Sequence, residues 1–101
     1  MQNCNKNTKD TADKDALQQL CELRTQIDTL DDQLRQLFLE RMDLVQQVGA
    51  LKAEKDIPVL HTDRENEVLM RVNTGLTLEQ RQNVTELFQT LFEISRRQQS
   101  G

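Results

Sequence analysis

Leucine recurs at every seventh position through the first half of the chain, which is the repeat of a helix that packs along its length against other helices. The repeat comprises Leu23, Leu30, Leu37, Leu44 and Leu51. A second row, offset by four residues, reads Leu20, Ile27, Leu34, Arg41 and Val48. The pattern continues from about Lys14 to Lys55 without a proline. It predicts one helix of roughly 60 Å, at about 1.5 Å per residue.

A short helix is predicted after this long one. Pro58 ends the long helix, because proline disfavours helical backbone at the residue before it. Thr62 and Glu65 have the spacing of a capping box, in which two side chains at the start of a helix hydrogen-bond to each other's backbone. Gly75 is the expected C-terminal stop, because glycine readily adopts the left-handed conformation that ends many helices.

Thr77 and Gln80 form a second capping box, which opens a third helix. The predicted inner face of that helix comprises Val84, Leu87, Phe88, Leu91, Ser95 and Gln99, with Phe92 and Ile94 at its edges. We therefore predict an all-α fold of three helices, one very long, one short and one medium, in a domain of residues 14–101. Residues 1–13 are polar and lack periodicity, and we predict that they form a disordered tail.

The composition agrees with a helical fold and favours a second copy of the chain. Only 36% of the 101 residues are hydrophobic, and the three Gly and one Pro are too few for the turns of a β-rich fold. The core of a single copy would be thin. A helix of roughly 60 Å is also too long to be covered by the rest of so short a chain. We therefore predict a two-fold homodimer that buries the uncovered half of the apolar seam.

The charge pattern argues against several classes of partner. The formal net charge is −4, without a dense run of Lys or Arg, so neither nucleic acid nor an anionic membrane is expected to bind. The sequence has no secretory signal and no apolar run long enough to span a bilayer. Cys4 and Cys21 lack metal-ligand spacing, and we interpret them as reduced thiols of a cytoplasmic protein. No metal site is predicted.

Polar side chains occupy inward positions on all three predicted helices. They are Arg41, flanked by Arg24 and Lys52, on the first helix, Glu65 on the second, and Ser95 and Gln99 on the third. Each position has a structural explanation by itself. Arg41 could set the register of a helical assembly, Arg24 could form an interhelical ion pair, and Lys52 could favour the helix dipole. Together, the polar positions on three helices predict a polar pocket inside a helical bundle.

We expect this pocket to bind an anion, because two Arg and one Lys face a single Glu. A buried cation is costly unless an anion meets it, and guanidinium groups bind carboxylates through paired hydrogen bonds. The expected ligand is a small dianion with a hydroxyl or ether oxygen for the remaining polar groups. No nucleophile with an adjacent base is apparent in the sequence. A reaction in this pocket would therefore rely on positioning and electrostatics.

The segments that carry these residues resemble a known family. They read LRTQIDTLDDQLRQLFLERMDLVQQVGALKAEKDIPV, then DRE, then LFQTLFEISRRQQ, over roughly residues 17–99. In their order and spacing they are similar to the all-helical class of chorismate mutase. The resemblance implies an intertwined helical homodimer with two active sites, each completed by an arginine of the partner chain. It also implies an isomerase of the shikimate pathway to aromatic amino acids, which rearranges chorismate to prephenate without a cofactor.

The resemblance further implies roles for individual residues. Arg24 would act in trans, and Arg41 would bind a substrate carboxylate from within the same chain. Lys52 and Gln99 would address the ether oxygen of chorismate, where negative charge grows as the bond breaks. Glu65 would accept the ring hydroxyl while ionised. The implied catalytic set is Arg41, Lys52, Glu65 and Gln99, and the implied substrate-binding set adds Arg24, Arg64 and Ser95.

Two other functions stay open on the sequence. A lyase on the same scaffold would cleave pyruvate from isochorismate with the same cationic clamp, although Glu65 after Arg64 and the loop with Pro58 favour the mutase. A non-catalytic dimerisation module would instead pair the cations with acidic residues across its interface. His61 departs from the acidic residue often found at its loop position in the class, and we assign it no role.

Overall fold

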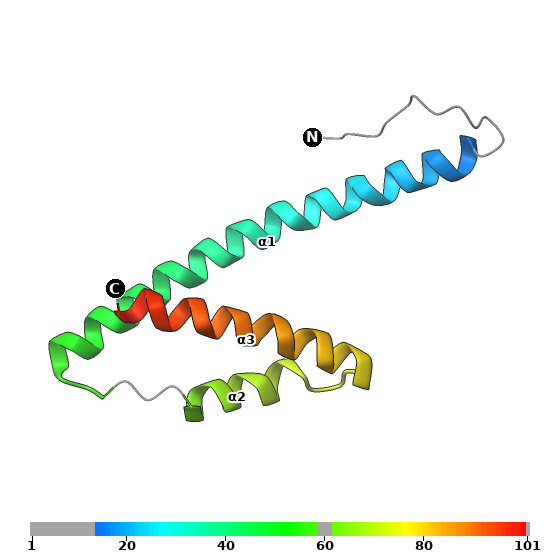
Figure 1. The fold of residues 1–101 in the computed structure, drawn as a ribbon. Coiled ribbons are helices and arrows are strands. Elements are labelled where there is room, and N and C mark those ends of the chain that lie inside the picture. The colour runs from blue at the N-terminus through cyan, green and yellow to red at the C-terminus, as the bar shows by residue number, and fades with distance from the viewer. Residues whose placement is uncertain (1–13, 59–61, 101) are drawn as a thin grey trace. The chain divides into compact units, whose positions relative to one another are not determined.

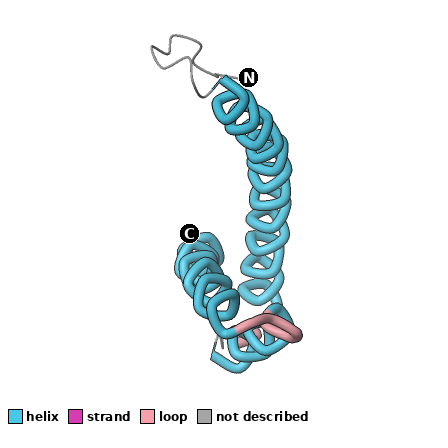
Figure 2. The backbone as a smooth tube through the Cα atoms, turned by 90° about the vertical axis from the view of Figure 1, so that its right-hand side faces the viewer, coloured by secondary structure: helices cyan, strands magenta, loops and turns pink. Residues whose placement is uncertain are grey.

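The computed structural model describes residues 14–58 and 62–100, which form three helices (Figure 1). The helices are α1, Lys14–Lys55; α2, Thr62–Val72; and α3, Leu78–Ser100. Figure 2 shows only helices and loops in this part of the chain, which confirms the predicted all-α fold. No helix among the described residues is long and apolar enough to cross a membrane. The predicted tail and His61 lie outside the described residues.

The chain divides into two units, residues 1–40 and residues 41–101. The described part of the first unit, residues 14–40, is the N-terminal portion of α1. Its leucines are largely exposed, with fractional exposures of 56% for Leu23, 58% for Leu30 and 62% for Leu37. A helix with such a row of exposed leucines has an apolar face of the kind that a partner surface buries.

The structure corrects one prediction in the first unit. Cys21 is disulfide-bonded, so the prediction of a reduced thiol at this position is wrong. Cys4 lies outside the described residues. The prediction rested on the absence of a metal-ligand or framework spacing, and the spacing of two cysteines in sequence says little about whether either one forms a disulfide.

The second unit contains the C-terminal portion of α1 together with α2 and α3, and α2 and α3 lie side by side in opposite directions (Figure 1). Its buried apolar core consists of Met42 from α1, Val68 from α2 and Phe92 from α3. The ring of Phe92 meets that of Phe88 edge to face, with centroids 6.2 Å apart. No side chain in residues 14–58 and 62–99 is less than 2% exposed, which agrees with the thin core expected for one copy.

A residue with left-handed backbone follows each of the first two helices. After α1, Asp56 has a φ of 61°, and the N–H of Ile57 donates to the carbonyl of Lys52 at 2.8 Å. This is the Schellman arrangement, in which the residue after the helix turns the chain back toward its last turn. After α2, Gly75 has a φ of 79°, but it lies three residues beyond Val72, so the helix ends before the glycine that was predicted to stop it. Glycine adopts this conformation without strain, whereas Asp56 does so at a cost.

The two predicted capping boxes have different outcomes. At α3 the box forms, because the N–H of Thr77 donates to Gln80 Oε1 at 3.0 Å and the N–H of Gln80 donates to Thr77 Oγ1 at 3.2 Å. At α2 the carboxylate of Glu65 accepts hydrogen bonds from Arg96 instead of returning to the backbone of Thr62. The pair with arginine joins two ionised groups through two hydrogen bonds, whereas the cap would give the carboxylate a single backbone N–H, so the arginine takes the carboxylate away from the cap.

The inner face of α3 is also rotated from its prediction. Phe92, expected at the edge of this face, is buried with 4% exposure, whereas Leu87, expected within it, is 51% exposed. Helical periodicity defines an apolar stripe about one hundred degrees wide, and the partner helices decide which part of the stripe faces the core.

Candidate functional site

A cavity of about 300 Å³ lies in the second unit, between the C-terminal portion of α1, α2 and α3. Its polar lining comprises Arg41, Lys52, Arg64, Glu65, Ser95, Arg96 and Gln99. Its apolar lining comprises Leu44, Val45, Val48, Val68 and Phe92. The volume matches the lower end of pockets that take small organic ligands, and the mixed lining is typical of such pockets.

The structure brings six of the seven predicted site residues around this one cavity. They are Arg41, Lys52, Arg64, Glu65, Ser95 and Gln99. The seventh, Arg24, belongs to the first unit, where it is exposed, and it does not line the cavity. The predicted convergence of polar groups from three helices is therefore a feature of the second unit alone.

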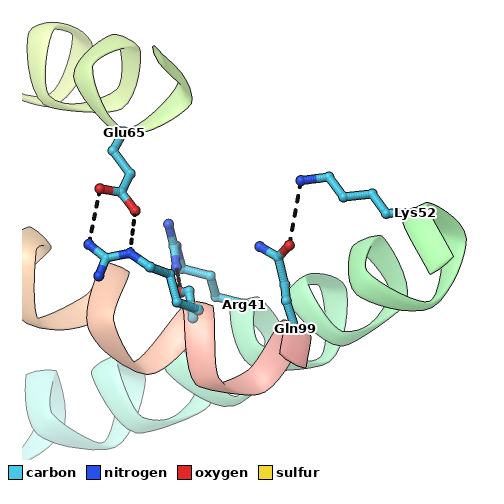
Figure 3. A network of polar contacts seen from close by, with 6 residues as sticks. Arg41, Lys52, Glu65 and Gln99 are labelled. Atoms are coloured by element: carbon cyan, nitrogen blue, oxygen red, sulfur yellow. Dashed lines mark hydrogen bonds and ion pairs between the residues drawn. The ribbon is translucent and has the colours of Figure 1, made fainter. Parts of the chain in front are cut away.

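Arg41 and Ser95 connect α1 to α3 at one side of the cavity. The Nη1 of Arg41 donates to the hydroxyl oxygen of Ser95 at 2.8 Å, and Ser95 is buried with 7% exposure (Figure 3). Burial, and secondarily the like charge of Arg64, lowers the pKa of Arg41. No carboxylate among the described residues forms an ion pair with Arg41. The guanidinium is thus partly desolvated and repelled by a neighbouring cation, and no described carboxylate neutralises it.

Lys52 and Gln99 form a second connection between α1 and α3. The Nζ of Lys52 donates to Oε1 of Gln99 at 3.5 Å (Figure 3). Because an ammonium group can only donate, this contact directs the amide oxygen of Gln99 to Lys52 and leaves the amide N–H groups for another partner. Lys52 also forms no ion pair within the part of the chain that the structure describes.

Glu65 is held by Arg96, which was not among the predicted site residues. Arg96 donates from Nε to Oε2 of Glu65 at 3.0 Å and from Nη2 to Oε1 at 3.1 Å, so the two side chains form a bidentate pair between α3 and α2 (Figure 3). The signal that identifies Arg96 is its place three residues before Gln99, on the same side of α3. Arg96 was not predicted because it follows Ser95 near the end of α3, where an arginine is common.

Arg64 is oriented by a different carboxylate. Its Nη1 lies 2.7 Å from Oε1 of Glu67, one helical turn away, and both side chains are well exposed, at 66% and 69%. The predicted neighbours Arg64 and Glu65 therefore do not pair with each other. An exposed pair of this kind contributes little to stability, and it leaves Arg64 at the rim of the cavity.

The cavity is strongly cationic. Among the described residues, four cations, Arg41, Lys52, Arg64 and Arg96, line it against the single carboxylate of Glu65. Arg96 is neutralised by Glu65 and Arg64 by Glu67, whereas Arg41 and Lys52 have no carboxylate partner among the described residues. Two unpaired cations beside two amide or hydroxyl groups match a small dianion that also carries polar oxygens.

A metal centre is not observed in this site. Within residues 14–58 and 62–100, no group of three His, Cys, Asp or Glu side chains lies close enough to hold a metal ion. The chemistry that the described side chains themselves offer is ionic and hydrogen-bonding contact, directed into one small volume.

Comparisons with known proteins agree with this geometry. The chain is 43% identical over 49 residues to the T-protein of Haemophilus influenzae. The aligned residues make up 48% of this chain and 13% of that protein. It is 30% identical over 56 residues to a bifunctional chorismate mutase/prephenate dehydratase of Aquifex aeolicus. The aligned residues make up 55% of this chain and 16% of that protein. The chain therefore matches less than a fifth of the length of either relative. No solved structure matches it.

The family comparison covers most of the chain. A family described as chorismate mutase type II matches residues 23–100, which include every residue that lines the cavity and, in the first unit, Arg24. The matched range contains all the segments in which polar lining residues were predicted. It begins before residue 41, where the second unit starts. By this match over residues 23–100, the chain belongs to the chorismate mutase type II family.

Proposed function

We propose that this chain catalyses the rearrangement of chorismate to prephenate. The observation that carries the proposal is the pair of cations, Arg41 and Lys52, which face one cavity without a carboxylate partner among the described residues. Leaving two such charges unpaired costs stability, and a dianionic ligand would remove that cost. The family supports this reading, and the bifunctional relative carries chorismate mutase in its name.

Substrate clamping is assigned to Arg41, with Ser95 beside it. Chorismate is a flexible dianion that reacts from a compact conformer, so holding its carboxylates removes much of the entropic part of the barrier. Arg41 already donates one N–H to Ser95, and its other N–H groups are available to a carboxylate. Arg64, which is paired with Glu67 at the rim, would offer its remaining N–H groups to the substrate.

Stabilisation of the breaking bond is assigned to Lys52 and Gln99. Negative charge grows on the ether oxygen in the transition state, and a compact ammonium group beside an amide N–H favours that state over the ground state. The contact between Lys52 and Oε1 of Gln99 supports this assignment, because it turns the donor side of the amide away from Lys52. Glu65 would accept the hydrogen of the ring hydroxyl.

The active protein is proposed to be a homodimer in which Arg24 completes the site of the partner chain. The support is the apolar seam of α1, which is uncovered in both units: Leu30 and Leu37 are 58% and 62% exposed, and Leu44 and Leu51 are 60% and 51% exposed. A second copy of the same helix is the partner whose leucine repeat matches this surface. Arg24 lies on that helix, beside Leu23 of the seam.

Small molecules, rather than nucleic acid or membrane, are proposed as the partners besides the second copy, since the net charge of −4 would repel polyanions. The cytoplasm is proposed as the compartment on the sequence argument alone. The disulfide of Cys21 is the observation against it, because disulfides are rare in the cytosol.

The test of the function is incubation of the purified protein with chorismate and, separately, with isochorismate. Loss of chorismate absorbance with formation of prephenate and without pyruvate supports the proposal. Pyruvate released from isochorismate, without any prephenate, would instead identify the lyase. If neither substrate is consumed while the protein is a folded dimer, the non-catalytic dimerisation module is the correct function.

A further inference from the structure

We propose that Arg96 is a positioning residue that keeps the Glu65 carboxylate away from the substrate-binding cations and aims it at the substrate hydroxyl. The inference rests on the proposed function and concerns the same cavity. Arg96 lines this cavity, yet no role was assigned to it from the sequence. Its action would be exerted through Glu65, by the two hydrogen bonds of 3.0 and 3.1 Å that join the two side chains.

The geometry of the pair determines the orientation of the carboxylate. Two parallel N–H groups of Arg96 occupy one lone pair on each oxygen of Glu65, so the carboxylate plane cannot rotate without breaking both bonds. Each oxygen retains a second lone pair, which a substrate hydroxyl can use as acceptor. Arg96 comes from α3 and Glu65 from α2, so the pair also holds the orientation across two helices (Figure 3).

The charges of the cavity explain why this restraint matters for substrate. In the part of the chain that the structure describes, Glu65 is the single carboxylate among four cations that line the cavity. A flexible Glu65 would be attracted to Arg41 or Lys52, the two cations without a carboxylate partner in the described residues. It would then compete with the dianion for the charges that bind it. Pairing with Arg96 satisfies the carboxylate and leaves Arg41 and Lys52 for the substrate.

A purely structural role fits the exposure of the pair poorly. The side chains of Arg96 and Glu65 are 44% and 20% exposed. Ion pairs that are this accessible to water contribute little to folding stability. The bidentate form, by contrast, is the geometry that gives orientation, and lysine cannot reproduce it.

The experiment is a double-mutant cycle of Arg96→Met and Glu65→Gln, with kcat and KM for chorismate measured for each variant. We expect Arg96→Met to reduce kcat/KM about tenfold, mainly through a higher KM, at an unchanged melting temperature. In the Glu65→Gln background the same substitution should have no further effect. Arg96→Lys should restore little, because it lacks the paired donors. The matched control is Arg97→Met, which removes the same charge from the neighbouring exposed position outside the cavity.

The remaining outcomes overturn the inference. Equal losses from Arg96→Met in both backgrounds would show that Arg96 acts on the substrate directly. A similar loss in Arg97→Met would show that the effect comes from the net charge and not from the contact with Glu65. A melting temperature lowered in Arg96→Met alone would show that the role of Arg96 is structural. If the folded wild-type protein does not convert chorismate, the proposed function itself fails and this inference with it.

Discussion

Gly49 lies directly against the backbone of Gln99. A Cβ atom at Gly49 would be 2.8 Å from the carbonyl oxygen of Gln99 and 2.9 Å from its Cα, distances shorter than any ordinary contact. The absence of a side chain therefore lets the end of α3 approach α1 and places Gln99 within reach of Lys52, at 3.5 Å. The closeness of two backbones is thus what sets the position of a proposed catalytic amide.

Replacement of Gly49 by alanine should displace Gln99 and lower kcat about 10²-fold, since a shift of roughly 1 Å at a reacting group has an effect of this size. It should also reduce the free energy of unfolding by about 1–3 kcal/mol, because backbone atoms cannot rotate away from the added methyl group. Steady-state kinetics and urea unfolding at one protein concentration measure the two effects.

The control for this substitution is Ala50→Gly, at the next, exposed position of α1. It should cost about 1 kcal/mol of stability through helix propensity and leave kcat as in the wild type. If Gly49→Ala were instead more stable than the wild type and fully active, the close approach to Gln99 would have no functional consequence.

Substitution of Arg41 by methionine should abolish most activity, by a factor on the order of 10²–10³, with stability within about 1 kcal/mol of wild type. The folded state lowers the pKa of Arg41, so the charge destabilises the protein at every pH below that lowered pKa. This cost disappears only at strongly alkaline pH, near the ordinary pKa of arginine. Removing the charge offsets the lost hydrogen bond to Ser95.

Thermal unfolding of Arg41→Met at pH 6 and pH 8, with and without chorismate, tests this expectation. The difference from wild type should be the same at both pH values, and chorismate should stabilise the wild type but not Arg41→Met. Arg81→Met, which removes an exposed cation of α3 outside the cavity, should behave as the wild type. Chorismate stabilisation that persists in Arg41→Met would contradict its role as a clamp.

Glycine at position 56 should stabilise the protein by about 1 kcal/mol. Asp56 has a φ of 61°, a conformation that costs an ordinary residue about this much and costs glycine nothing. Its negative charge also lies at the C-terminal end of α1, where the helix dipole disfavours it. Urea unfolding of Asp56→Gly measures the gain, and Asp56→Ala should show no comparable gain, because alanine removes the charge but keeps the strain.

Mixing two inactive variants tests whether Arg24 acts in trans. Arg24→Ala and Lys52→Ala should each be nearly inactive as homodimers. In a mixed dimer, the chain with Lys52 intact receives Arg24 from its partner, so one of the two sites is complete. Random exchange of subunits should restore about a quarter of wild-type activity. If no activity returns although mixed dimers are detected by mass spectrometry, Arg24 does not complete the partner's site.

The residues of the site were predicted unequally well. Arg41 interrupts a row of aliphatic residues, and such a break in a periodic pattern is visible without a structure. Lys52, Glu65, Ser95 and Gln99 were selected because each stands at an inward position of a helix, and all of them line the cavity. Arg96 was missed, since an arginine near a helix end is ordinary and its partner, Glu65, is distant in sequence.

The sequence by itself determined the three helices and the capping box at Thr77, because each depends on side chains within a few residues of one another. Only the tertiary structure decided which face of α3 is buried and that Glu65 pairs with Arg96 instead of capping α2. It also decided that the backbone of Gln99 packs directly against Gly49. These features depend on contacts between helices, whose energies local propensity and periodicity do not contain.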